Sequence, residues 1–168
     1  MPQKTVTNGW RGLVPMRSTR ADVERLLGEA TDSHGLTRIY KTQTERVDVS
    51  YSSGSCGPGE MWKAQRDTVT RLVVTPEQRT LIEDLDTRDY ALVKESHPET
   101  WVQYWSPDGG IVIQTTMTDG AEEVLSIAYQ ATKSEKTLKC RPPSRSVPVG
   151  MSYLSFMLVF KPVSFAKR

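Results

Sequence analysis

The chain has 168 residues, of which 37% are hydrophobic and 25% charged, a composition that excludes a disordered protein and suits one domain or two small ones. Its net charge is +2, but residues 132–168 hold eight Lys and Arg against one acidic residue, a net charge of +7, so residues 1–131 carry −5. The mild negative charge of residues 1–131 argues against nucleic-acid binding, which needs a basic face. The sequence contains no run of 18 or more apolar residues, so it predicts no membrane-spanning helix.

The composition changes along the chain and predicts one folded domain with flanking segments. The first residues are polar and contain no apolar core of a signal peptide, so a leader for export would have been removed or would lie upstream. A basic stretch rich in Pro and Ser precedes an apolar run that is too short to cross a bilayer as a helix, and that run predicts an extra strand or the start of a further domain. The predicted segments are a disordered lead-in (1–9), an α+β domain (10–131, with similar halves 10–80 and 81–131), a basic linker (132–150) and an apolar tail (151–168).

A short amphipathic helix is predicted within residues 18–28. Thr19 can cap its first turn, an Asp follows three residues later, and a glycine can end it in the left-handed conformation. Val23, Leu26 and Leu27 fall at positions i, i+3 and i+4 and form one apolar stripe. A helix of about nine residues is not stable alone, so we expect the stripe to pack on a sheet.

Strand-like runs follow this helix and recur in the second half. The alternation is cleanest over residues 46–52, where Val47, Val49 and Tyr51 share one face. Residues 85–92 are predicted to form a second short helix or a turn, with Thr87 as a cap. The fold expected is therefore α+β: two units, each a helix followed by a three-stranded antiparallel meander, forming one antiparallel sheet layer packed by short helices. The other predicted strands are 36–42, 68–75, 101–105, 111–117 and 123–129, the last with Leu125, Ile127 and Tyr129 on one face.

Two cysteines and two histidines are the candidate reactive residues. Cys56 and Cys140 can pair in an oxidising compartment and close a loop of about 84 residues, worth ~4 kcal/mol, or they can stay free thiols in the cytosol. Cys56 with His34 or His97 would suit a thiol hydrolase, whereas the alternative places both histidines in exposed linkers. These four residues lack the local spacing of a zinc site, and motifs of known enzymes are absent, so we predict no catalytic residue, no metal site and no cofactor.

Aromatic residues are the better candidates for binding. Trp101, Gln103 and Trp105 alternate along one predicted strand and share a face, while the apolar residues between them share the other face. A meander beneath one helix layer needs only one inward face, so one aromatic row can be exposed, as is typical of partner contacts. The alternative is that the helix layer, Trp10, Trp62 or the tail covers both faces. Trp62 is also a candidate contact residue.

The helix motif Ser-Thr-Arg-Ala-Asp-Val-Glu-Arg-Leu-Leu-Gly, followed by Tyr40 and the alternating strand, resembles the helix-to-hairpin core of SmpA/OmlA-type outer-membrane assembly lipoproteins. It is also similar to the tandem repeats of β-lactamase-inhibitor-like proteins, and to exported bacterial proteins that add a Cys…Trp loop and a later cysteine. The resemblance covers about residues 10–140. It implies protein binding without catalytic residues. A lipobox cysteine is not found near the start of this sequence, so the resemblance does not by itself predict membrane anchoring.

The sequence thus predicts a non-enzymatic module, periplasmic or secreted, that binds a protein or associates with the cell envelope. The candidate partner-binding residues are Trp101, Gln103, Trp105 and Trp62, and the basic tail could contact an anionic envelope surface weakly. One alternative is a small thiol-dependent hydrolase that uses Cys56 with a histidine. A second is a purely structural envelope component with no ligand surface.

Overall fold

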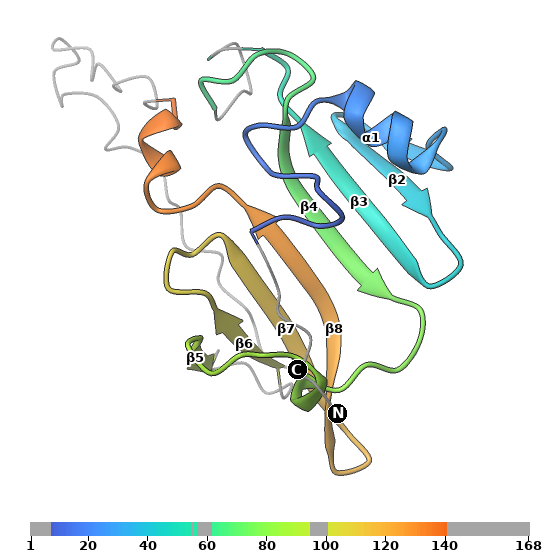
Figure 1. Ribbon diagram of the computed structural model, residues 1–168, viewed down its shortest axis with the longest axis vertical. Coiled ribbons are helices and arrows are strands. Elements are labelled where there is room, and N and C mark those ends of the chain that lie inside the picture. Colours follow the sequence, from blue (N-terminus) through green and yellow to red (C-terminus); the bar gives the residue numbers. More distant parts are fainter. Residues whose placement is uncertain (1–7, 55, 57–61, 95–100, 141–168) are drawn as a thin grey trace, which may run out of the picture.

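The computed structural model describes residues 8–54, 56, 62–94 and 101–140. These residues form one antiparallel sheet with a single α-helix against it (Figure 1). The elements are α1 (Arg20–Leu27), β1 (Asp32–His34), β2 (Thr37–Lys41), β3 (Glu45–Tyr51), β4 (Val69–Pro76), the 3-10 turn η1 (Ile82–Asp84), β5 (Ala91–Lys94), β6 (Trp101–Trp105), β7 (Ile111–Thr118), β8 (Ala121–Gln130) and the 3-10 turn η2 (Glu135–Leu138). The order of the eight strands is β1-β2-β3-β4-β8-β7-β6-β5, so two runs of consecutive strands meet where β4 pairs with β8.

The predicted α+β fold is wrong. The described residues form one eight-stranded antiparallel sheet with one α-helix, not two helix-plus-meander units packed by short helices. Residues 85–92, predicted as a short helix or a turn, do not form a helix: the Thr87 carbonyl accepts a hydrogen bond from the Tyr90 N–H at 2.9 Å in a turn, and β5 follows. Leu92 pairs with Tyr104 on β6, so pairing with a strand distant in sequence overrides a weak local preference for helix. β1 is a further strand that was not predicted from the sequence.

Helix α1 forms where the sequence predicts it, because its signals are local. The Thr19 side chain accepts from the Asp22 N–H at 3.4 Å, and the Asp22 carboxylate accepts from the Thr19 N–H at 2.9 Å, which completes a capping box. Val23 is fully buried and Leu27 packs on the core, but Leu26 is 45% exposed. The apolar stripe is therefore narrower than predicted.

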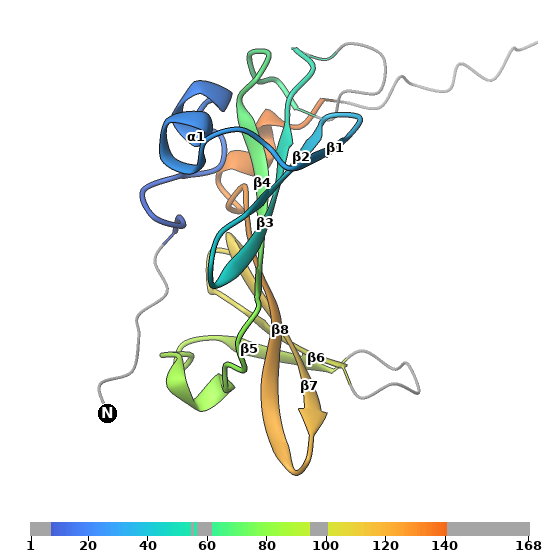
Figure 2. The ribbon, with the colours of Figure 1, turned by 90° about the vertical axis from the view of Figure 1, so that its right-hand side faces the viewer.

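The core lies on the face of the sheet that α1 covers. Val47, Val49 and Tyr51 of β3 are buried on this face, as their alternation predicts. Figure 2 shows α1, the N-terminal segment and η1 on the same side of the sheet. The remaining large core residues come from the N-terminal segment and the other strands: Trp10, Leu13, Tyr40, Val69, Leu72, Val74, Leu85, Ile111, Ile113, Val124 and Tyr129.

A β-bulge in β8 reverses part of its predicted alternation. Leu125 was expected on the same face as Ile127 and Tyr129. The register between β7 and β8 shifts so that Thr115 pairs with Val124, and Val124 is buried while Leu125 is 37% exposed. An extra residue on one strand of a pair turns the following side chains over, so the expected face was wrong for Leu125.

Candidate functional site

The pairing of residues on neighbouring strands shows which side chains project from each face of the sheet. Residues directly opposite each other on paired antiparallel strands project to the same side. Tyr104 lies opposite Ile113, which is fully buried on the α1 side. Trp105 lies opposite Val112, so both project to the other side. We call the residues of β5, β6 and β7 that project away from α1 the open face: Ala91, Val93, Trp101, Gln103, Trp105, Val112, Gln114, Thr116 and Thr118.

The predicted row of Trp101, Gln103 and Trp105 lies together on the open face. Trp101 is 44% exposed, and Val93, which pairs with Gln103 on β5, is 42% exposed, while Gln103 and Trp105 are half-buried. The Trp105 indole Nε1–H donates a hydrogen bond to the Gln103 side-chain oxygen at 3.0 Å, which fixes the orientation of both side chains. The row thus presents large apolar area in a set orientation, together with an amide that can bond a partner.

The described elements that could cover this row lie elsewhere. α1, the N-terminal segment and η1 are on the opposite side of the sheet (Figure 2), and Trp10 is buried there. The predicted linker beyond Cys140 and the tail (151–168) lie outside the described residues. In the part of the chain that the structure describes, Trp101 and Val93 are therefore open to solvent.

The structure does not bring Trp62 into this row. Trp62 forms an isolated β-bridge with Lys139, and the Lys139 ammonium lies 5.4 Å from the centre of the indole ring. The Lys63 N–H donates to the Leu138 carbonyl at 2.7 Å in the same junction. Trp62 therefore helps to join the segment after β3 to the segment after β8.

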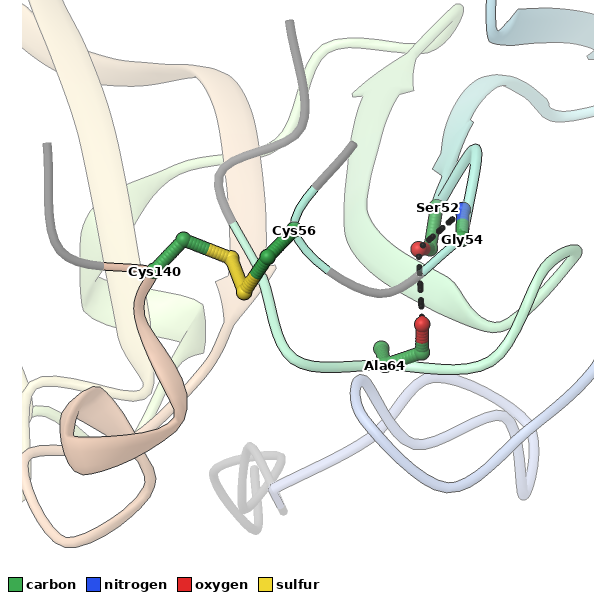
Figure 3. The surroundings of a disulfide bond; sticks show 5 residues. All are labelled: Ser52, Gly54, Cys56, Ala64 and Cys140. Carbon is green, nitrogen blue, oxygen red and sulfur yellow. Dashed lines mark hydrogen bonds between the residues drawn. A yellow bond between two sulfur atoms is a disulfide. The ribbon is translucent and has the colours of Figure 1, made fainter. Parts of the chain in front are cut away.

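Cys56 and Cys140 form a disulfide in that junction (Figure 3). Their Cα atoms are 5.5 Å apart and the cysteines are 84 positions apart in sequence. Ser52 supports the loop beside Cys56: its hydroxyl donates to the Ala64 carbonyl at 3.2 Å and accepts from the Gly54 N–H at 3.1 Å. The predicted pairing of the two cysteines is therefore confirmed.

The groups required by the thiol-hydrolase hypothesis are not assembled among the described residues. The Cys56 sulfur is bonded to Cys140, and the His34 side chain is exposed, with its Nε2 3.3 Å from an Asp32 carboxylate oxygen. His97 lies outside the described residues. Within the described ranges, no group of three or more His, Cys, Asp or Glu is placed to hold a metal ion. No helix among them is long and apolar enough to span a bilayer.

Sequence reasoning missed a polar cluster that supports β6 from behind the open face. The Tyr104 hydroxyl donates to one Glu122 carboxylate oxygen at 2.9 Å, and the Thr115 hydroxyl donates to the other at 2.6 Å. Desolvation and the hydrogen bond to Glu122 raise the pKa of Tyr104 to about 12, so its hydroxyl stays a donor at neutral pH. The three residues come from three strands, so no local pattern could have revealed the cluster, which ties β6 to β7 and β8.

No protein-family model matches the chain, and no curated protein matches it. Among solved structures, the fold is similar to the crystal structure of a DUF4309 family protein, YjgB, from Bacillus subtilis subsp. subtilis str. 168. The sequence identity is 14%, the TM-score is 0.46, and the match covers 76% of this chain and 86% of that chain. A likeness at this level transfers no function. The resemblance to SmpA/OmlA-type lipoproteins stays a prediction.

Proposed function

We propose that this chain is an exported, non-enzymatic protein-binding module whose partner docks on the open face. The observation that carries the proposal is the exposure of Trp101 and Val93 beside the hydrogen-bonded pair of Trp105 and Gln103. Adjacent apolar side chains of this size on a sheet surface are typical of contact sites, and tryptophan is enriched among the residues that dominate binding energy. Because the Trp105 side chain is already held in place, little rotamer entropy would be lost on binding.

The disulfide supports a periplasmic or secreted location. Cystines persist in oxidising compartments and are rare in the reducing cytosol. The net charge of +7 over residues 132–168 favours a further, weak association with an anionic envelope surface. A purely structural role would not require an exposed tryptophan, and the hydrolase alternative would require a free thiol at Cys56, so neither is favoured by a specific observation.

Site-specific photo-crosslinking in cells of the source organism tests the proposal. p-Benzoylphenylalanine replaces Trp101 in one variant and Leu26 in a matched variant, because these side chains are 44% and 45% exposed but lie on opposite sides of the sheet. We expect a discrete protein adduct from position 101 and none from position 26. Adding Trp105→Ala should weaken the interaction roughly tenfold or more and so reduce the adduct.

The proposal is wrong if position 101 gives no adduct in a protein that folds with its disulfide intact, or if both positions give the same products. Circular dichroism and a gel run without reductant confirm the fold and the disulfide of each variant. The identity of the adduct, read by mass spectrometry, then names the partner.

A further inference from the structure

The α1 side of the sheet contains a cavity of about 470 Å³, away from the open face. Its apolar wall includes Trp10 from the N-terminal segment, Val74 from β4, and Ile127 and Tyr129 from β8. Gly9, Arg11, residues near the start of β3 and the end of β4, and residues at the end of η1 form the rest of its lining. A volume in this range is typical of pockets for small molecules, which are mostly apolar with a few placed polar groups.

The wall formed by the N-terminal segment is held in place by the chain itself. The backbones of Trp10 and Leu13 exchange two hydrogen bonds of 2.9 Å, which closes a tight turn. The Arg11 guanidinium lies 4.7 Å from the centre of the Trp10 ring and forms an ion pair of 3.0 Å with Glu45 at the start of β3. The turn is therefore fixed to the sheet, so the cavity does not need a ligand to form its shape.

Tyr129 supplies an unused polar group in this wall. The residue is 5% exposed and lines the cavity, and its hydroxyl makes no hydrogen bond with any residue that the structure describes. Burial raises the pKa of Tyr129 well above its usual value, and Tyr90 and Glu45 act in the same direction, so the hydroxyl stays protonated and can donate. The hydroxyl is therefore available to donate to a ligand that carries an acceptor and occupies the cavity.

We propose that this cavity binds a small, neutral and largely apolar molecule with a carbonyl oxygen, which accepts a hydrogen bond from the Tyr129 hydroxyl. The lining disfavours a carboxylate in place of a neutral carbonyl group, because the Arg11 charge is already paired with Glu45 and Asp84 adds a further negative charge. The carbonyl provides the acceptor, and the apolar remainder packs against Trp10, Val74 and Ile127. This site lies on the opposite side of the sheet from the open face and does not depend on the proposed protein partner.

Two probes of similar size separate the role of the hydroxyl from that of the apolar wall. Acetophenone carries a carbonyl group, whereas ethylbenzene has the same ring without it. We titrate each into the full chain and follow the indole signal of Trp10 and the methyl signals of Val74 and Ile127 by NMR. Both probes should give saturable shifts at these residues, and acetophenone should bind about three- to tenfold more tightly, as expected for one hydrogen bond.

Tyr129→Phe removes only the oxygen that makes no protein hydrogen bond, so it should fold normally. We expect it to abolish the preference for acetophenone and to leave the affinity for ethylbenzene unchanged. The matched control Tyr104→Phe removes a hydroxyl outside the cavity and should keep the preference. Absence of saturable shifts at the cavity residues, or an equal preference for acetophenone in Tyr129→Phe, would overturn the proposal. Neither outcome affects the cross-linking result at Trp101.

Discussion

Asp22 makes the start of α1 sensitive to pH. Its pKa is lowered below the ordinary value of 3.8, first by the hydrogen bond from the Thr19 backbone N–H, then by the Thr19 hydroxyl, with Arg25 adding a smaller effect. A carboxylate with a lowered pKa in the folded state stabilises that state fully above its ordinary pKa. This stabilisation is lost as the pH falls through the lowered value.

We therefore predict that Asp22→Asn flattens the acid limb of the stability curve. The amide oxygen can still accept from Thr19, but it does not titrate and has no charge for the helix dipole or Arg25. Urea unfolding measured from pH 6 down to pH 2 should show a smaller loss of stability below pH 4 in the variant. Glu29→Gln, at an exposed carboxylate beyond the end of α1, is the control and should retain the dependence of the parent protein.

At the scale of the element, the bulge in β8 decides which of two neighbouring side chains contributes more to stability, and the order differs from the one that simple alternation predicts. Val124 is 6% exposed and packs in the core, whereas its neighbour Leu125 is 37% exposed. Val124→Ala should lower the free energy of unfolding by roughly 1–3 kcal/mol through lost burial and a cavity. Leu125→Ala should change it by about 0.5 kcal/mol or less. Urea unfolding of the two variants tests this order, and a larger loss for Leu125→Ala would place the bulge elsewhere.

The elements that could be predicted from the sequence are those with complete local signals. The capping box and the glycine located α1, and the alternation of Val47, Val49 and Tyr51 located β3. The segment before β5 has a possible cap at Thr87 but no apolar stripe, and its structure is decided by pairing with β6. The bulge depends on the register between two strands, which no single strand encodes.

At the scale of the whole molecule, the sequence could predict only the part of the candidate site that lies on a single strand, β6. Alternation placed Trp101, Gln103 and Trp105 on one face, but which face stays open depends on where α1 packs. Trp62 was grouped with them by residue type alone, and it contacts Lys139 instead. The cavity could not be predicted, because Trp10, Val74 and Tyr129 belong to segments that only the folded sheet brings together.

The disulfide provides a link between the two runs of strands in addition to the pairing of β4 with β8. It joins the loop after β3 to the segment after η2, across 84 positions of sequence. Cross-linking a loop of this length restricts the unfolded chain, so replacing both cysteines by serine should lower the free energy of unfolding by about 4 kcal/mol.

Equilibrium unfolding in urea compares the oxidised protein, the Cys56→Ser/Cys140→Ser variant and the oxidised protein after reduction. The variant and the reduced protein should have the same midpoint, well below that of the oxidised protein, because each lacks the same constraint on the unfolded chain. A loss of less than about 1 kcal/mol would mean that the β4–β8 ladder alone holds the two runs together. Since the open face lies on β5, β6 and β7 and contains neither cysteine, cross-linking from position 101 should persist in the variant wherever it remains folded. Loss of the adduct from a folded variant would instead show that the disulfide junction, with Trp62, is part of the partner's contact surface.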